Sequence, residues 1–270
     1  MMNTRKFVSQ FYLWVVLIVM YAPLLFIFVF SFTEARSLGN WTGFTLDLYR
    51  SLFTGATEGA RSLLDALRNT LLIALASSLC ATVLGTLAAV GMHNMRGRNR
   101  RALQFLNNIP MVNPDIITGV ALFLLFVALN VSRGFVTVVI SHIVFCTPYV
   151  LLNVLPKLSQ MNPNVYEAAL DLGATPGYAL RKVLIPQLRP GMISGFLLSF
   201  VMSLDDFAVT YFTAGNAGLQ TLSTYIYADA RKGGLTLELK PMMSLIFLLI
   251  LVILIIYNLR SLKNQKQSGQ

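Results

Sequence analysis

Charged side chains are scarce in this 270-residue sequence: Asp, Glu, Lys and Arg together make up 12% of it, while hydrophobic residues make up 56%. Typical soluble domains carry about twice that charged fraction. A soluble domain of this size could not hide so much apolar surface in its interior. The scarcity of charge therefore argues against a soluble globular protein and favours a membrane protein.

Cysteine and histidine are also rare, with two residues of each. Cys80 and Cys146 both lie inside apolar segments, so they form neither a disulfide framework nor a zinc motif. His93 lies beside a basic loop and His142 lies inside an apolar segment, and neither has partners at ligand spacing. We therefore expect no metal and no cofactor in this chain.

Acidic residues are outnumbered, which gives a net charge of +10. The basic residues are scattered between apolar segments, and no nucleic-acid-binding motif accompanies them, so nucleic acid is not the expected partner.

A membrane-spanning helix needs about 20 mostly apolar residues. Six segments meet or approach this length and predict an all-α polytopic fold: about 11–32, 67–92, 103–131, 135–155, 190–213 and 241–259.

The first apolar segment follows Arg5 and Lys6, as in a signal peptide, but no small-residue cleavage pattern follows it, so we expect it to be retained. With the N-terminus inside, 13 Lys and Arg fall on the inner side and 8 on the outer side. Positive residues favour the cytoplasmic side. The sequence therefore predicts a cell-membrane protein with both termini cytoplasmic and one transmembrane domain over 1–270.

The inner loop at about 156–189 has the features of a structured segment. Asn162 is a suitable N-cap, Pro163 suits the first helical position, and Glu167 lies near the positive end of the expected helix. Gly173 is a natural left-handed stop. Four apolar residues fall on one face of this helix: Val165, Ala168, Ala169 and Leu172.

A second helix is expected directly after the first. Thr175 and Pro176 repeat the pattern of a cap followed by proline, and we expect this helix to run to about Leu184 and to end at Pro186. The loop is thus predicted to be a helical hairpin. The small residues on its first helix permit close approach by another surface, which is either the chain's own membrane domain or a separate partner.

The hairpin resembles the EAA motif of ABC-importer permeases. Glu167-Ala168-Ala169, then Gly173, then Val183-Leu184-Ile185-Pro186 follow that motif's spacing without a gap, and Val183 and Ile185 are conservative departures. The position of the loop, before the next-to-last helix, also fits the family. The resemblance implies that Glu167, Ala168, Ala169, Gly173 and Pro186 belong to a loop that couples the permease to an ATPase.

The resemblance covers most of the chain and is strongest to spermidine/putrescine permeases. It rests on residues 111–119, 141–146 and 203–207, whereas 237–241 departs from the family pattern. It implies a type I importer fold, a second permease subunit forming a heterodimer, a cytoplasmic ATPase dimer, an extracytoplasmic solute-binding protein and a polyamine solute. The chain has no GxxxxGK[ST] phosphate loop, so we expect a transport subunit rather than an enzyme.

Three carboxylates fall inside apolar segments: Asp115, Asp205 and Asp206. A charge at the bilayer centre costs about 2.5–3.5 kcal/mol on insertion scales, and such residues usually face a bundle interior or a wet cavity. Pro114 is expected to break the helix before Asp115. We expect these acids to line a cation path; the alternative is that they cap helices or pair with Arg68 or Ser203.

A polyamine carries ammonium groups on an apolar chain, so its path requires carboxylates together with aromatic faces. The aromatic residues near the acids in sequence are the candidate walls: Phe145, Tyr149, Phe207 and Tyr211.

Other functions compete with the permease interpretation. Asp115 with Asp205 or Asp206 suggests an intramembrane aspartyl protease, because paired acids can share a proton and activate water. This interpretation leaves the hairpin unexplained, and the usual Gly-x-Gly-Asp context is missing. A channel or carrier that works alone is a further alternative. Within ABC importers, the alternative is a different cationic solute.

Overall fold

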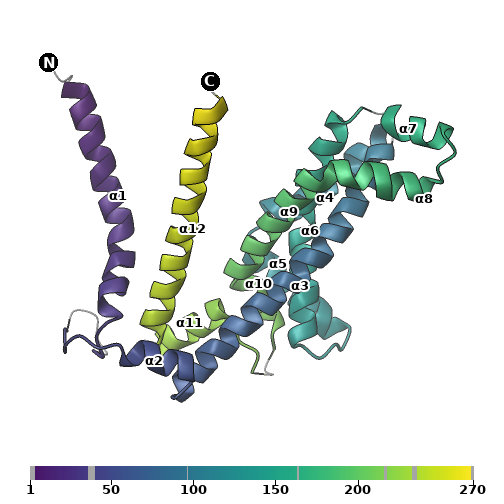
Figure 1. Cartoon of the computed structure of the whole chain (residues 1–270). Coiled ribbons are helices and arrows are strands. Elements are labelled where there is room, and N and C mark those ends of the chain that lie inside the picture. Colours follow the sequence, from purple (N-terminus) through teal and green to yellow (C-terminus); the bar gives the residue numbers. More distant parts are fainter. Residues whose placement is uncertain are drawn as a thin grey trace. The chain divides into compact units, whose positions relative to one another are not determined.

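The computed structural model describes residues 4–35, 40–95, 97–162, 164–215, 218–232 and 236–268. The regular elements in these ranges are helices (Figure 1), which confirms the expected all-α fold. In chain order they are α1 (Thr4–Phe30), α2 (Asp47–Thr54), α3 (Glu58–Asn94), α4 (Gly97–Val112), α5 (Asp115–Ala128), α6 (Phe135–Gln160), α7 (Asn164–Asp171), α8 (Pro176–Ala179), a π-helical turn (Leu180–Leu184), α9 (Ile185–Asp205), α10 (Ala208–Thr213), α11 (Leu222–Arg231) and α12 (Leu239–Ser268).

Four helical stretches in the described ranges are long and apolar enough to cross a membrane by themselves: Gln10–Phe30 within α1, α3, α6 and the continuous helix Pro176–Asp205. The α4–α5 pair passes the same test only when it is taken together, and it is bent by 105°. Leu239–Val252 of α12 is a shorter apolar helix. These elements correspond to the six expected segments, of which the third and the fifth are broken.

The bend between α4 and α5 lies at Asn113 and Pro114, where the sequence predicts it. Pro114 has no N–H to donate and disfavours helical geometry at Asn113. Pro114 itself is extended, with ψ of 139°. Helix α5 follows directly, and its first hydrogen bond runs from the Ile117 N–H to the Pro114 carbonyl at 2.9 Å. Pro110 lies inside α4 without ending it.

The fifth expected segment, 190–213, is not one helix. It begins earlier, at Pro176, and α9 ends at Asp205. Asp206 is extended, with ψ of 128°, and the short helix α10 follows from Ala208. Hydrophobicity alone hides this second break, because Phe207 and the residues after it are as apolar as a continuous span.

The contacts divide the chain into two compact units, Asp65–Tyr225 and Met1–Leu64 with Ile226–Gln270. In the first unit, α6 packs along α9, and α3 runs beside them (Figure 1). Val150 of α6 lies between two glycines: a Cβ on Gly85 of α3 would be 2.7 Å from the Val150 Cβ, and one on Gly195 of α9 would be 3.1 Å from its Cα. Glycine thus permits the close helix packing that membrane bundles use.

In the other unit, α1 packs with α12, and α2 buries Leu48 and Leu52. Two buried charges lie at the start of α12. The Glu238 carboxylate accepts from Ser51 Oγ at 3.0 Å and Thr57 Oγ1 at 2.6 Å, and Lys240 donates to two carbonyls of the loop after α1. Glu238 and Lys240 lie in the stretch 237–241 that departs from the family pattern, and their contacts hold this unit together.

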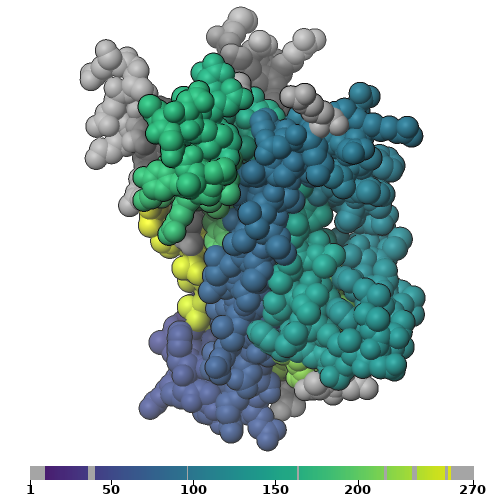
Figure 2. Space-filling model, turned by 90° about the vertical axis from the view of Figure 1, so that its right-hand side faces the viewer, coloured from purple at the N-terminus to yellow at the C-terminus, as the bar shows by residue number. Residues whose placement is uncertain are grey.

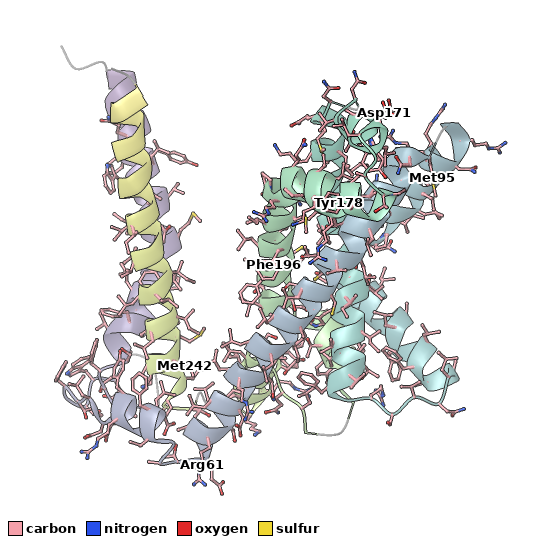
Figure 3. All side chains as sticks on the ribbon, turned by 45° about the vertical axis from the view of Figure 1, so that its right-hand side comes forward. Arg61, Met95, Asp171, Tyr178, Phe196 and Met242 are labelled. Atoms are coloured by element: carbon pink, nitrogen blue, oxygen red, sulfur yellow. The ribbon has the colours of Figure 1, made fainter. Side chains whose placement is uncertain are left out.

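Apolar side chains remain exposed along the spanning helices of the single chain. Many of the side chains drawn in Figure 3 project outward from the helices. Trp14 and Met20 on α1 are examples of large apolar residues that are exposed. The space-filling view shows α3 uncovered along one face of its unit (Figure 2). Lipid or a partner subunit would have to cover this surface, which agrees with the membrane assignment made from composition.

Candidate functional site

The predicted hairpin is present between α6 and α9. Its first helix, α7, begins after Asn162, whose Oδ1 accepts from the Asn164 N–H at 3.0 Å. Pro163, expected at the first helical position, lies outside the described residues. The helix ends as predicted at Gly173, which has φ of +87°. The Ala174 N–H closes the turn by donating to the Ala169 carbonyl at 3.0 Å.

The second helix begins where the sequence predicts it but does not end there. Thr175 Oγ1 accepts from the Tyr178 N–H, and Pro176 occupies the first turn. The expected stop at Pro186 is wrong: the chain stays helical through a π-turn, in which the Ile185 N–H donates to the Leu180 carbonyl, and on into α9. The π-turn shifts the hydrogen-bond ladder, so that Pro186 falls in a first turn, where its missing N–H costs little.

The apolar face of α7 is not covered in the single chain. No residue of α7 is buried. Leu172 is 89% exposed just after the helix. Tyr178 on α8, labelled in Figure 3, is 59% exposed. If the hairpin packed this face on the chain's own helices, these side chains would be buried. Around the turn they line an open hollow of about 550 Å³ together with Ala169 and Gly173.

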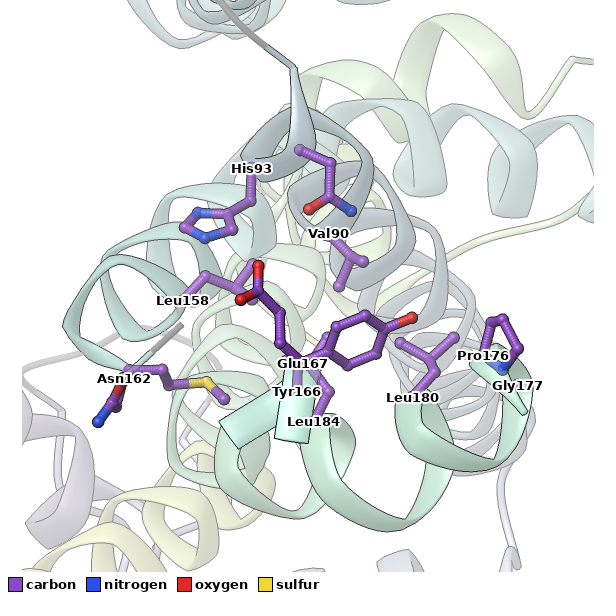
Figure 4. Close-up of a pocket in the computed structure, with 12 residues that line it drawn as sticks. Val90, His93, Leu158, Asn162, Tyr166, Glu167, Pro176, Gly177, Leu180 and Leu184 are labelled. Carbon is purple, nitrogen blue, oxygen red and sulfur yellow. The ribbon is translucent and has the colours of Figure 1, made fainter. Parts of the chain in front are cut away.

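The opposite side of the hairpin borders a pocket of about 340 Å³ (Figure 4). The pocket lies where α3 and α6 end against α7 and α8. Tyr166 and Glu167 contribute from α7, and His93 contributes from the end of α3. Apolar side chains complete the wall: Val90, Leu158, Met161, Leu180 and Leu184. Glu167 therefore lies in the first turn of α7 at the rim between the helical bundle and the uncovered surface.

The three candidate acids lie in different surroundings. Asp115 is the first residue of α5 and is exposed. Asp205 is the last residue of α9 and is also exposed. Asp206 is only 8% exposed. Asp115 and Asp206 are close enough for their charges to interact, so the two helix breaks bring two of the three acids into one region.

Asp206 caps α10. Its carboxylate accepts from the Val209 N–H at 3.1 Å, the Thr210 N–H at 2.8 Å and the Thr210 hydroxyl at 2.9 Å. His142 Nε2 lies 3.3 Å from the same carboxylate. These contacts match the capping role that we gave as the alternative for the acids. Of the two partners suggested there, Ser203 joins the same cluster through His142 Nδ1 at 2.6 Å.

The four candidate aromatic residues form two pairs. Phe145 and Tyr149 meet edge to face on α6 at 5.8 Å, and Phe207 stacks on Tyr211 at 5.3 Å. Phe145 is buried in the core of its unit, whereas Tyr149 is half-buried and lies within electrostatic range of Asp115. Tyr149, Phe207 and Tyr211 thus keep exposed surface, whereas the buried Phe145 contacts Tyr149 from the core.

The sequence reasoning missed His142. It is fully buried and forms hydrogen bonds to two other helices of its unit, to Ser203 of α9 and Thr210 of α10. The search for metal ligands passed over it because no His, Cys or acid stands at ligand spacing. Its position alone could have identified it, because an ionisable residue inside a predicted membrane span is a functional candidate by default.

Comparison with known proteins shows the family of this chain. Residues 81–267 match the model of the family described as binding-protein-dependent transport system inner membrane component. The spermidine/putrescine permease PotC of Haemophilus influenzae is 32% identical over 97% of this chain and 99% of its own length. The putrescine permease PotI of Escherichia coli K12 is 34% identical over 84% of this chain and 81% of its own length.

Solved structures resemble the fold. A bacterial ABC transporter that imports the acidic polysaccharide alginate matches with a TM-score of 0.70 at 16% identity, covering 96% of this chain and 95% of that chain. The MetNI methionine ABC transporter matches with a TM-score of 0.57 at 23% identity, covering 73% of this chain and 92% of that chain. These likenesses concern the fold alone.

Family membership decides between the competing interpretations. A protease or a carrier working alone would not match a transport-permease model over residues 81–267 and also permease relatives over most of the chain. The protein is a multi-pass membrane protein and a transport subunit, not an enzyme. The chain belongs to the family of binding-protein-dependent transport system inner membrane components, the permease subunits of ABC importers.

Proposed function

We propose that this permease conducts a polyamine, such as spermidine or putrescine, into the cell. The names of the curated relatives support this solute class. The assembly contains a second permease subunit as heterodimer partner, a cytoplasmic ATPase dimer and an extracytoplasmic solute-binding protein. The whole chain serves as one transmembrane permease domain in the cell membrane, and both of its termini are cytoplasmic.

The observation that carries the coupling role is the uncovered apolar face of the hairpin. Leu172 and Tyr178 are largely exposed in the single chain, while the turn at Gly173 holds them at the tip. An ATPase subunit that covers this face would bury apolar surface without rearranging the hairpin. Because helix α8 continues through the π-turn into α9, a displacement of the docked hairpin moves a membrane-spanning helix with it.

Within the coupling loop, each residue has a physical role. Ala168 and Ala169 keep the docking face small enough for close approach, and Glu167 places a negative charge near the positive end of α7. Pro186 lies at the start of α9, where it follows the π-turn without breaking the helix. Alternating access then follows, because ATP and solute bind the two orientations of the helices unequally.

Recognition of the solute is proposed at the two helix breaks. Asp115 and Asp205 are exposed carboxylates that can pair with ammonium groups. Tyr149, Phe207 and Tyr211 offer aromatic faces to the methylene chain and to the cation. Asp206 and Phe145 shape this region from the buried side.

The test is ATP-dependent uptake of labelled spermidine and putrescine by the complete complex in liposomes. We expect uptake that unlabelled polyamine suppresses and that an equal concentration of a neutral diamide does not. Liposomes without internal ATP are the control. A complex whose solute-binding protein stimulates ATP hydrolysis, but which takes up no polyamine, would refute the solute class while leaving the family assignment intact.

A further inference from the structure

His142 lies at the centre of a buried polar cluster that joins four elements of the Asp65–Tyr225 unit. Its Nδ1 lies 2.6 Å from the Ser203 hydroxyl of α9, and its Nε2 lies 2.9 Å from the Thr210 hydroxyl of α10. Ser203 in turn lies 3.0 Å from the Ser77 hydroxyl of α3. Each of these side chains is almost completely buried. Buried polar groups must share their protons without leaving a donor or acceptor unpaired.

The Nε2 side of the ring fixes one proton. The Thr210 hydroxyl has a single proton, which it donates to the Asp206 carboxylate at 2.9 Å. Its oxygen can therefore only accept from the ring. The Asp206 carboxylate, 3.3 Å from Nε2, can also only accept. An unprotonated Nε2 would face two oxygen lone pairs, so Nε2 carries a proton.

The Nδ1 side favours a second proton, because of the two contacts made by the Ser77 hydroxyl. The shorter one is its donation to the Ile73 carbonyl at 2.7 Å, and when that bond is made Ser77 can only accept from Ser203 at 3.0 Å. The Ser203 proton is used in that contact, which leaves its oxygen to accept from the ring. In this arrangement Nδ1 also carries a proton. The hydroxyls of Ser77, Ser203 and Thr210 then each donate one hydrogen bond and accept another.

We infer that His142 is an imidazolium that forms a buried ion pair with Asp206, and that it acts as the positioning residue of the solute path. A lone buried carboxylate would be costly, whereas a paired and fully hydrogen-bonded one is tolerated. The charge of Asp206 is thereby compensated inside the protein, and the solute does not use it. Asp115 and Cys146 also lie within electrostatic range of Asp206, and Asp205 is its neighbour in the chain.

The pair also places α10, and α10 places α5. The cluster ties α10 to α3, α6 and α9, and α10 packs tightly on α5: a Cβ on Gly119 would be 3.0 Å from the Ala208 carbonyl oxygen. Asp115 begins that same helix α5. His142 thus fixes where the exposed acid lies without touching the solute. This last consequence rests on the proposed function, while the proton placement does not.

The proton placement is tested by nitrogen NMR of the complete complex labelled in histidine. This chain has two histidines, and the signal lost in His142→Gln identifies the one of interest. We expect two protonated ring nitrogens for His142 near neutral pH. A ring with one unprotonated nitrogen would overturn the ion pair.

The positioning role is tested with His142→Gln, Asp206→Asn and the double variant, measured for complex survival on heating and for uptake. His142→Gln leaves a buried carboxylate unpaired, so we expect the surviving fraction to fall about tenfold or more. The double variant removes both charges, so we expect its surviving fraction to return most of the way to that of wild type. Ser141→Ala, which removes a neighbouring buried hydroxyl outside the cluster, is the matched control and should resemble wild type.

The solute concentration at half-maximal uptake separates positioning from direct contact. In the double variant, where neutral hydrogen bonds replace the ion pair and keep α10 in place, we expect this concentration to stay within roughly twofold of wild type. His142→Gln alone leaves the Asp206 charge uncompensated and should displace α10, so we expect it to raise the concentration, as Asp115→Asn does. If the double variant is stable but loses recognition as Asp115→Asn does, Asp206 contacts the solute and the inference fails. If His142→Gln survives heating as wild type does, it also fails. Absence of polyamine uptake in wild type would refute the proposed solute instead, with the NMR result unaffected.

Discussion

Replacement of Gly173 by valine isolates the geometry of the coupling hairpin. The residue has φ of +87°, and a Cβ built on it has open space within 4 Å. The substitution therefore creates no clash, and its whole cost is conformational. A side chain in the left-handed region costs about 1–2 kcal/mol, and more when it is β-branched. At about 1.4 kcal/mol for each factor of ten, the population of the native turn falls roughly five- to thirtyfold relative to competing turns.

Gly177→Val is the matched control for this prediction. Gly177 also has open space around its Cβ, but its φ is not in the left-handed region. We expect Gly173→Val to lower ATP-dependent uptake several-fold and to weaken co-purification of the ATPase, whereas Gly177→Val stays near wild type. Equal behaviour of the two variants would show that the left-handed turn does not position the docking face, and the coupling role of the hairpin would lose its geometric basis.

Three further predictions concern charge and topology. Glu167→Lys should abolish coupled uptake while the complex still inserts in the membrane, because it reverses the charge in the first turn of α7; retained ATP-coupled uptake would contradict this. Asp115→Asn should raise the polyamine concentration at half-maximal uptake roughly ten- to hundredfold, the worth of a charged hydrogen bond, and an unchanged value would exclude Asp115 from the path. An impermeant thiol reagent applied outside the cell should label Ala56→Cys but not Tyr178→Cys, in a chain whose Cys80 is replaced; the reverse pattern would overturn the orientation.

Much of the coupling hairpin could be predicted from the sequence because its signals are local. The Asn162 cap, the stop at Gly173 and the restart at Thr175 each depend on a few neighbouring residues, and the structure has all three. The end of the second helix could not be predicted in this way. Pro186 normally argues for a stop, but a π-turn before it moves the proline into a first turn, and no short sequence pattern specifies a π-turn.

The candidate acids were found from the sequence, but their roles were not separable there. All three are carboxylates in apolar segments, and Asp205 and Asp206 are neighbours. What separates them is tertiary: Asp206 turns inward to His142, which lies 64 positions earlier in the chain and is contributed by α6. Distant contacts of this kind leave no trace in spacing or periodicity, so His142 was passed over.

The two helix breaks explain why acids occur at these positions at all. A helix that starts inside an apolar bundle exposes N–H groups that water cannot reach, and an acid at the start satisfies them. Asp206 is fully used in this way, since it accepts from the amides that begin α10 and is paired with His142. Asp115 begins α5 beside it but remains exposed. One break therefore uses its acid to hold the bundle, and the other leaves its acid exposed. We therefore expect a charge-removing substitution to affect stability at Asp206 and, on the proposed solute path, recognition at Asp115.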